Sequence, residues 1–201
     1  MRLRNVLQFM VAAMSAVLLS GCGYNAIQTQ DQGVKAAWAE VLNQYQRRSD
    51  LIPNIVNTVK GEAGFEQDTL TKVVEARASV GRMTVTPETL NDPEAFAKFQ
   101  KAQGELGSAL QRLMVISENY PNLKANAAFQ DLRAQLEGTE NRIAIARKRY
   151  IDTVREYNTT IALLQNQLGK MLTGAKEKPQ FTVENEAAIS KPPTVDFNKK
   201  P

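Results

Sequence analysis

Histidine is absent from the 201-residue sequence, and Cys22 is its only cysteine. A serine nucleophile normally needs a histidine to take its proton, so only serine–lysine and carboxylate schemes remain for a hydrolase. No serine lies in a Gly-x-Ser-x-Gly or Ser-x-x-Lys pattern. The serines beyond the N-terminal segment are Ser49, Ser79, Ser108, Ser117 and Ser190. We therefore expect no enzymatic activity and no cofactor, and a single cysteine leaves no internal disulfide.

Strong charge of either sign is also lacking. The chain carries 25 basic and 21 acidic side chains, with no run of five like charges. Removal of Arg2 and Arg4 with an N-terminal leader would leave 23 basic and 21 acidic side chains, a net charge of +2. Because nucleic-acid binding needs a clustered basic face, the composition argues against nucleic acid as a partner.

The first residues have the pattern of a secretory signal. Arg2 and Arg4 precede an uncharged, mostly apolar run at 6–19, which is shorter than the roughly 20 residues that span a bilayer. Leu-Ser-Gly-Cys at 19–22 resembles the bacterial lipobox. This resemblance implies cleavage before Cys22, a diacylglyceryl group on its sulfur and acylation of the new N-terminus. The alternative is an uncleaved signal-anchor with an incidental cysteine.

The chain divides into four segments by composition. We expect a lipoprotein signal peptide at 1–21, a polar linker to the lipid anchor at 22–30, a helical bundle at 31–172 and an extended or disordered tail at 173–201. The tail is rich in lysine and proline, as disordered segments often are.

Apolar residues between 31 and 83 recur three and four positions apart, which is the spacing of a helix packed in a bundle. The phase continues almost unbroken, which favours one long helix bent at Pro53, whereas Gly61 and Gly64 favour two helices. The pattern leaves both arrangements open. The first stripe consists of Val34, Trp38, Val41, Tyr45, Arg48, Ile52, Ile55 and Val59.

Two further helices follow. Asp92-Pro93-Glu94 is a strong helix start, because aspartate caps free N–H groups and proline fits the first turn. This helix is expected to end before Pro121. A second stripe from Phe129 to Met171 predicts one continuous last helix of about 50 residues, roughly 75 Å long. The aromatic residues on these stripes, including Trp38, Tyr45, Tyr150 and Tyr157, are expected in the core.

These patterns predict an all-α fold. No segment alternates polar and apolar residues as a strand does. Helices this long must pack along one another, so we expect a long antiparallel up-and-down bundle of three to four helices.

Several segments together resemble the LemA family of bacterial envelope proteins. The most specific are Tyr-Pro-Asn-Leu-Lys-Ala-Asn at 120–126 and Leu-Glu-Gly-Thr-Glu-Asn-Arg-Ile-Ala at 136–144. Others lie at 34–38, 43–54, 59–61, 75–78, 150–152 and 157–158, and the tail residues that fit are Phe181, Glu184, Pro193, Val195 and Phe197.

The resemblance implies a membrane-held helical bundle with its bulk outside the cytoplasm. It implies no agreed catalytic activity and supplies no active-site residues. The chain departs from the family in two places. A lipobox stands where many members have a transmembrane helix, and Leu163-Leu164-Gln165 continues the helical pattern where Phe-Pro-like residues are expected.

Charged residues interrupt the apolar stripes. Arg48, Glu66 and Arg77 occupy stripe positions, and Thr139 does so beside Glu140. Such groups must pair, reach water or lose free energy on burial. They either fix the register of the bundle or form a polar seam that receives a partner helix. We expect Arg48 to pair with Glu140, because the two lie at similar distances from the starts of helices assumed to be parallel.

Acidic residues offer an alternative function, that of a carboxylate-lined bundle that binds a metal or a small ligand. Carboxylates alone could hold a hard cation, and the nearest candidates are Glu62, Glu66, Glu137 and Glu140. The sequence favours reading these residues as solvated faces or ion-pair partners, because the histidines of bundle di-iron sites are missing.

The favoured function is that of a non-enzymatic, lipid-anchored scaffold or adaptor. Cys22 would hold the bundle at the membrane, where it meets an unidentified envelope protein or further copies of itself. Gly23 replaces the aspartate associated with inner-membrane retention. In a host with two membranes, this favours the outer membrane, facing the periplasm. In a host with one, the bundle would lie on the outer face of the cytoplasmic membrane.

Overall fold

The computed structural model describes residues 2–182, with side chains at positions 8, 10 and 23–182. No strand occurs within residues 2–182, so the predicted all-α bundle is confirmed. The helices are α1 (Arg2–Lys60), α2 (Gln67–Gly81), α3 (Pro93–Ser117), α4 (Pro121–Ala125), α5 (Ala127–Ala162) and α6 (Gln167–Thr173), with short 3-10 turns η1 (Pro87–Asn91) and η2 (Leu164–Asn166).

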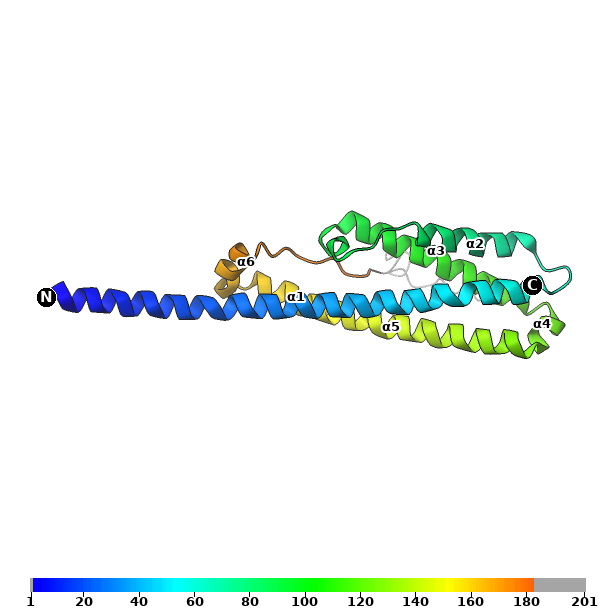
Figure 1. Ribbon diagram of the computed structural model, residues 1–201, viewed down its shortest axis with the longest axis horizontal. Helices are drawn as coiled ribbons and strands as arrows, with labels where there is room; N and C mark the ends of the chain where they lie inside the picture. The colour runs from blue at the N-terminus through cyan, green and yellow to red at the C-terminus, as the bar shows by residue number, and fades with distance from the viewer. Residues whose placement is uncertain (1, 183–201) are drawn as a thin grey trace, which may run out of the picture.

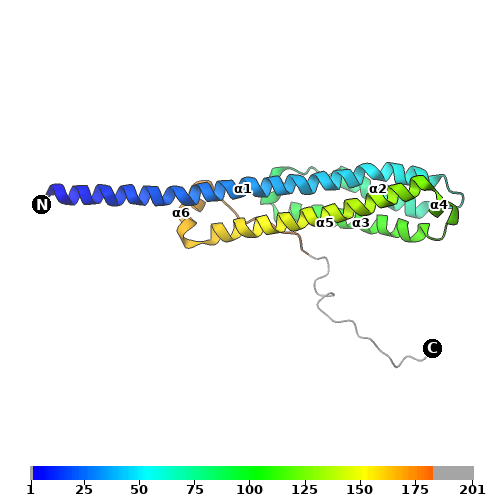
Figure 2. The same ribbon diagram turned by 90° about the horizontal axis from the view of Figure 1, so that it is seen from below.

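The molecule is a rod (Figure 1). Its longest element, α1, has 59 residues and runs from one end of the rod to the other, roughly 90 Å. Helix α5 returns alongside α1, and the hairpin of α2 and α3 lies against this pair (Figures 1 and 2). Successive long helices therefore alternate in direction, which is the expected up-and-down topology. In the part of the chain that the structure describes, no helix has both the length and the apolar character needed to cross a membrane.

Local capping explains where α3 and α5 begin. The Asp92 carboxylate accepts hydrogen bonds from the backbone N–H groups of Glu94 and Ala95, at 2.9 and 3.1 Å. Asn126 does the same for Phe129 at 3.1 Å. Each side chain satisfies N–H groups that lack a partner in the first helical turn, so the predicted start at Asp92 is confirmed.

Two buried clusters fill the rod. We call the cluster that packs on α1 between Ile27 and Tyr45 the aromatic core, and the cluster that packs on α1 between Ile52 and Val59 the aliphatic core. The aromatic core comprises Ile27, Val34, Trp38, Val41, Tyr45, Leu90, Phe96, Phe99, Ile143, Ala146, Tyr150, Val154, Tyr157, Ile161 and Phe181. The aliphatic core comprises Ile52, Ile55, Val56, Val59, Leu70, Val73, Leu106, Leu110, Leu113, Leu123, Phe129 and Leu136.

Segment 31–83 forms two helices. Helix α1 ends at Lys60, and Gly64 has a φ of 79°, a conformation that residues with a Cβ rarely adopt. The Tyr120 hydroxyl donates a hydrogen bond to the Gly64 carbonyl at 3.0 Å, which holds this turn against the far end of the bundle. Gly61 and Gly64 therefore predicted two helices correctly, whereas the nearly continuous spacing of apolar residues had favoured one.

The prediction of one continuous last helix is wrong. Helix α5 ends at Ala162, and Leu163 is extended, with a ψ of 133°. The side-chain amide of Asn166 donates to the carbonyl of Thr160 at 2.8 Å, and that of Gln167 donates to the carbonyl of Leu163 at 3.2 Å. These amides satisfy carbonyls that a continuing helix would otherwise use. Three residues predicted to be buried are consequently exposed, namely Leu164, Leu168 and Met171.

The segments that flank the bundle are more ordered than the sequence suggests. Residues 23–30, expected to be a linker, continue α1, and Ile27 is buried against the bundle. Residues 175–182 are extended, as predicted for the tail, but Phe181 is buried in the aromatic core. The tail beyond 182 and the side chain of Cys22 lie outside the described residues, as do the side chains of most of the leader at 1–21.

Candidate functional site: a polar cleft around Arg48

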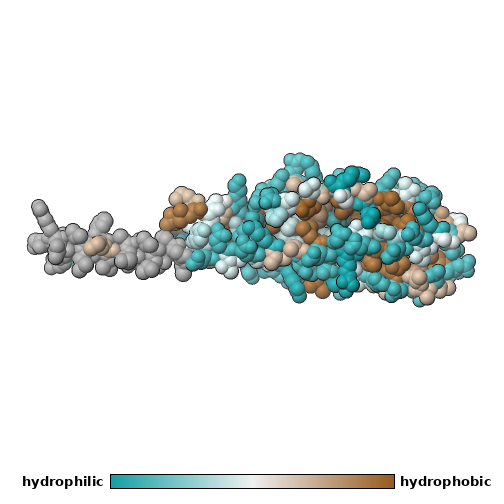
Figure 3. Space-filling view, viewed as in Figure 1, coloured by the Kyte–Doolittle hydropathy of each residue, from teal (hydrophilic) through white to brown (hydrophobic). Residues whose placement is uncertain are grey.

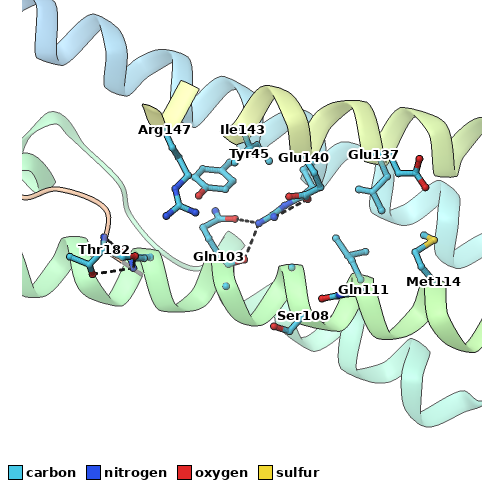
Figure 4. A pocket seen from close by; sticks show the side chains of 16 residues that line it. Tyr45, Gln103, Ser108, Gln111, Met114, Glu137, Glu140, Ile143, Arg147 and Thr182 are labelled. Atoms are coloured by element: carbon cyan, nitrogen blue, oxygen red, sulfur yellow. Dashed lines mark hydrogen bonds and ion pairs between the residues drawn. The ribbon is translucent and has the colours of Figure 1, made fainter. Parts of the chain in front are cut away.

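A cleft of about 660 Å³ opens between α3 and α5, with α1 as its floor (Figure 4). It lies where the aromatic core gives way to the aliphatic core. Residue Tyr45 of α1 belongs to the aromatic core and Leu110 of α3 to the aliphatic core, and both line the cleft. Thr182, from the extended tail, lines one end.

Arg48 is the centre of this cleft. Its side chain is only 3% exposed although it carries a full charge. One terminal nitrogen, Nη1, donates to Oε1 of Glu140 at 3.0 Å. The other, Nη2, donates to the backbone carbonyl of Gln103 at 3.0 Å and to the Gln103 side-chain oxygen. Three helices, α1, α3 and α5, are therefore joined through one guanidinium.

The Arg48 guanidinium has one hydrogen-bond donor that no group in the described structure accepts. Its Nε–H group is buried and has no hydrogen-bond partner within the described structure. The guanidinium carbon lies 5.0 Å from the centre of the Tyr45 ring, where a cation–π attraction contributes. Burial raises the pKa of the Tyr45 hydroxyl, although the nearby charges of Arg147 and Arg48 oppose this shift. Tyr45 is thus a neutral hydrogen-bonding group near neutral pH.

The remaining walls combine amides, cations and apolar side chains. They include Gln100, Gln111, Met114, Ile143 and Arg147. Arg147 also lies over the Phe181 ring, 4.5 Å from its centre, which links the cleft to the docked tail. This chemistry can donate hydrogen bonds to carbonyl or carboxylate groups and can pack against an apolar side chain. Ser108 is present, but the cleft offers it no histidine, and Glu140 is already engaged by Arg48.

The predicted pairing of Arg48 with Glu140 is confirmed, but the argument that led to it is wrong. The pairing rested on helices α1 and α5 running parallel, whereas they run antiparallel (Figure 1). The turn at 61–66 adds a reversal that the parallel arrangement omitted. Contacts such as Trp38 with Tyr150 show the same antiparallel register, because the residue number falls along α5 as it rises along α1.

Arg77 does not join this cleft. It lies on α2, and its Nε donates to the backbone carbonyl of Ser49 at 3.2 Å. It ties α2 to α1 by one hydrogen bond. Thr139 is fully buried and donates to the Gln135 carbonyl of its own helix at 2.8 Å. Both residues therefore serve the packing of the bundle.

The four candidate carboxylates are not brought together. Glu62 and Glu66 belong to the turn between α1 and α2, whereas Glu137 and Glu140 lie on α5. Glu137 accepts a hydrogen bond from Arg133 at 3.1 Å. Among the described residues, no group of three or more acidic or cysteine side chains is placed to hold a metal ion.

Sequence reasoning missed a second buried cation, Lys178. Its Nζ lies 2.6 Å from Oδ1 of Asn91 and 3.2 Å from Oδ1 of Asp31, and it faces the Tyr157 ring at 5.7 Å. The Asn158 side chain bonds the Lys178 backbone in both directions, at 2.9 and 3.0 Å. These contacts hold the tail between α1, η1 and α5. In the sequence, Lys178 lies within a lysine-rich segment that gives no sign of burial.

Comparison with known proteins adds an independent finding. The chain is 26% identical over 194 residues to Magnetosome protein MamQ of Magnetospirillum gryphiswaldense, a match that covers 86% of this chain and 68% of the relative. It is also 26% identical over 193 residues to Magnetosome protein MamQ 2 of Paramagnetospirillum magneticum, covering 85% of this chain and 68% of that protein. The sequence profile of the LemA family matches residues 37–197. These residues include α1 from position 37 onward, the other helices, the cleft and the docked tail, and the chain belongs to the LemA family.

Proposed function

We propose that this protein is a non-enzymatic scaffold or adaptor of the bacterial envelope. A lipid on Cys22 holds one end of the rod at the membrane, and the cleft between α3 and α5 receives a segment of a protein partner. The observation that carries this proposal is the buried Arg48 guanidinium at the floor of an open cleft. Membership of the LemA family and the similarity to the MamQ proteins support membrane association.

The chemistry of the cleft suits a polypeptide. Gln103 and Glu140 accept hydrogen bonds from the terminal nitrogens of Arg48, and its Nε–H is buried without a partner in the described structure. Arg147 and Gln111 line the same opening and can donate to carbonyl or carboxylate oxygens. Apolar side chains between them can accommodate the apolar face of an amphipathic helix. A partner segment with spaced acidic or amide groups and one apolar face therefore fits best.

The rod geometry sets the height of this cleft. Arg48 follows Cys22 by 26 positions along one unbroken helix, which corresponds to roughly 40 Å. A partner at the cleft would therefore bind well above the lipid headgroups. In a host with two membranes, we place the anchor in the outer membrane with the rod in the periplasm. In a host with one membrane, the rod would stand on its outer face.

Site-directed photocrosslinking in intact cells tests this proposal. A photoreactive amino acid replaces Gln111 in the cleft, and a matched control replaces Lys101, an exposed residue of the same helix outside the cleft. We expect a defined partner to be captured from Gln111 and not from Lys101. Capture should fall when Cys22→Ser removes the lipid acceptor, and mass measurement of the mature N-terminal peptide reports the lipid directly.

Two results would contradict the adaptor role. Equal capture from both positions would show that the cleft is not the contact surface. Crosslinks only between copies of this chain would favour self-assembly, which a concentration-dependent size measurement would then confirm.

A further inference from the structure

The break after α5 creates an apolar tip at the end of the bundle from which the first part of α1 projects (Figure 1). Leu164 is 88% exposed, Met171 is 72% exposed and Leu172 is 65% exposed. Leu163 and Leu168 are also exposed, so five large apolar side chains share η2, α6 and the residue before them. Figure 3 shows this apolar group standing out at the end of the bundle, beside the grey part of α1. We call these five residues the α6 tip.

A close backbone contact fixes the α6 tip beside the expected anchor. A Cβ on Gly169 of α6 would lie 3.1 Å from backbone atoms of Gly23 and Tyr24 on α1. A Cβ on Gly23 would in turn lie 2.8 Å from the side-chain oxygen of Asn166. The two glycines therefore allow α6 to lie directly against the turn of α1 that follows Cys22. The α6 tip and the predicted lipid share one end of the molecule.

The charge around the α6 tip favours a phospholipid surface. No acidic residue occurs at 1–30 or at 157–176, the two segments that meet there. The same segments contribute Lys170, which is partly buried, and Lys176, which is exposed. Asp31, the first acidic residue of α1, is paired with Lys35 at 2.7 Å and Lys178 at 3.2 Å. Exposed Glu177 follows Lys176 directly. The α6 tip itself combines apolar side chains with Lys170 and has no acidic residue within 157–176, a composition typical of helices that lie in the membrane interface.

We propose that the α6 tip inserts into the interfacial region of the bilayer and forms a second membrane contact beside the lipid on Cys22. This inference rests on the proposed membrane anchoring, and it adds how the rod is oriented. A lipid alone would leave the rod free to swivel about one point. With α6 also in the interface, the tilt of α1 and the direction in which the cleft opens are both fixed relative to the membrane.

A second copy of this chain is a poorer occupant for the α6 tip. Specific protein–protein interfaces usually involve about 20–30 residues on each side. The five exposed side chains of the tip fall well short of this number. A membrane requires no such area, because each apolar side chain inserts independently into the headgroup region.

The test uses the full mature lipoprotein in vesicles of phosphatidylethanolamine and phosphatidylglycerol. Cys22 is the only native cysteine, so a spin label can be attached at Met171→Cys once Cys22 is acylated. The matched control is Val115→Cys, because Val115 is an apolar α3 residue of similar exposure, 65%, toward the far end of the rod. We expect the label at 171 to be several-fold less accessible to a water-soluble nickel chelate and more accessible to oxygen than the label at 115.

Each outcome is decisive. Equal nickel accessibility at both positions, with the protein floating with the vesicles, would overturn the α6 insertion while leaving the anchor intact. Short distances between labels at 171 on two molecules would also overturn it, because a second copy would then cover the tip. If mass measurement shows no lipid on Cys22, the anchor proposal fails. The same accessibility comparison, made on vesicle-bound Cys22→Ser protein, then still decides whether the α6 tip inserts.

Discussion

The two halves of the rod are built differently. The aromatic core takes residues from α1, η1, α3, α5 and the extended tail, whereas the buried side chains of the aliphatic core are aliphatic except for Phe129. Trp38 lies 5.3–5.5 Å, centre to centre, from the rings of Phe96, Phe99 and Tyr150, and Phe181 closes the cluster. The half of the bundle nearer the expected anchor thus adds η1 and the extended tail to its helices, whereas the far half is packed from helices alone.

The polar layer around Arg48 separates these halves. It has the features of a register device, because a buried charge with partners on α3 and α5 tolerates few alternative alignments. The same layer opens into the cleft, so one set of residues can both set the register and present a binding surface. The difference between the halves shows that η1 and the extended tail contribute buried side chains on only one side of this layer.

The largest effect is expected from reversing the buried charge. Arg48→Glu places a carboxylate in a buried position beside Glu140, and we expect a loss of about 3–5 kcal/mol in the free energy of unfolding. Glu140→Arg should have a smaller effect, because Glu140 is half-exposed. The double reversal should recover about 0.5–3 kcal/mol of the summed losses. Urea denaturation of the four proteins measures this coupling, and purely additive losses would exclude an energetic role for the pair.

Trp38→Ala should damage the aromatic half specifically. Removing this indole from among its neighbouring rings leaves a large cavity, and we expect a loss of about 3–5 kcal/mol. The matched change in the aliphatic half, Leu110→Ala, should lose about 2–5 kcal/mol. Hydrogen exchange separates the two variants, since residues 175–182 should lose protection only in Trp38→Ala. Equal loss of tail protection in both variants would show that the halves do not differ in this way.

Phe181→Ala should release the tail with a smaller loss. The Phe181 side chain is buried in the aromatic core, and its removal is expected to lower stability by about 1.5–3 kcal/mol. Thr182→Ala is the control, because Thr182 is exposed and the change removes only the 3.5 Å contact of its hydroxyl with Gln100, while the bond from Gln100 to its backbone carbonyl stays. Limited proteolysis should cut near residue 178 in Phe181→Ala and spare the control. Unchanged cleavage would mean that Lys178 and Asn158 alone hold the tail.

Much of the fold follows from side-chain spacing. Every member of the first stripe, from Val34 to Val59, is buried, and this includes Arg48. The spacing of apolar residues indicates which face of a helix is buried, so the buried residues were predicted correctly where a helix is long and regular. It could not report direction, and the parallel arrangement assumed for α1 and α5 was therefore wrong.

The positions at which helices end are set by single residues, which the spacing of apolar residues does not take into account. The apolar pattern continued through Leu164, Leu168 and Met171, although the chain breaks at Leu163. The break depends on the amides of Asn166 and Gln167 folding back onto α5, which is a three-dimensional arrangement. The cleft could not be predicted for the same reason, because the hydrogen bonds from Arg48 to Gln103 depend on how α1 and α3 are placed relative to each other.

The smallest effect concerns the buried tyrosines, and it should also distinguish the halves. Burial raises the pKa of Tyr157 to about 12, whereas an unfolded tyrosine titrates near about 10. Between these values the unfolded chain releases the proton and the folded chain keeps it, so rising pH favours unfolding. The contribution to stability is complete below about pH 10 and falls by up to about 1.4 kcal/mol per pH unit above it. Tyr157→Phe should therefore show a shallower loss of stability between about pH 9 and about pH 11. Because Tyr45, Tyr150 and Tyr157 all belong to the aromatic core, hydrogen exchange at alkaline pH should rise first in that half, and an earlier rise in the aliphatic half would contradict this.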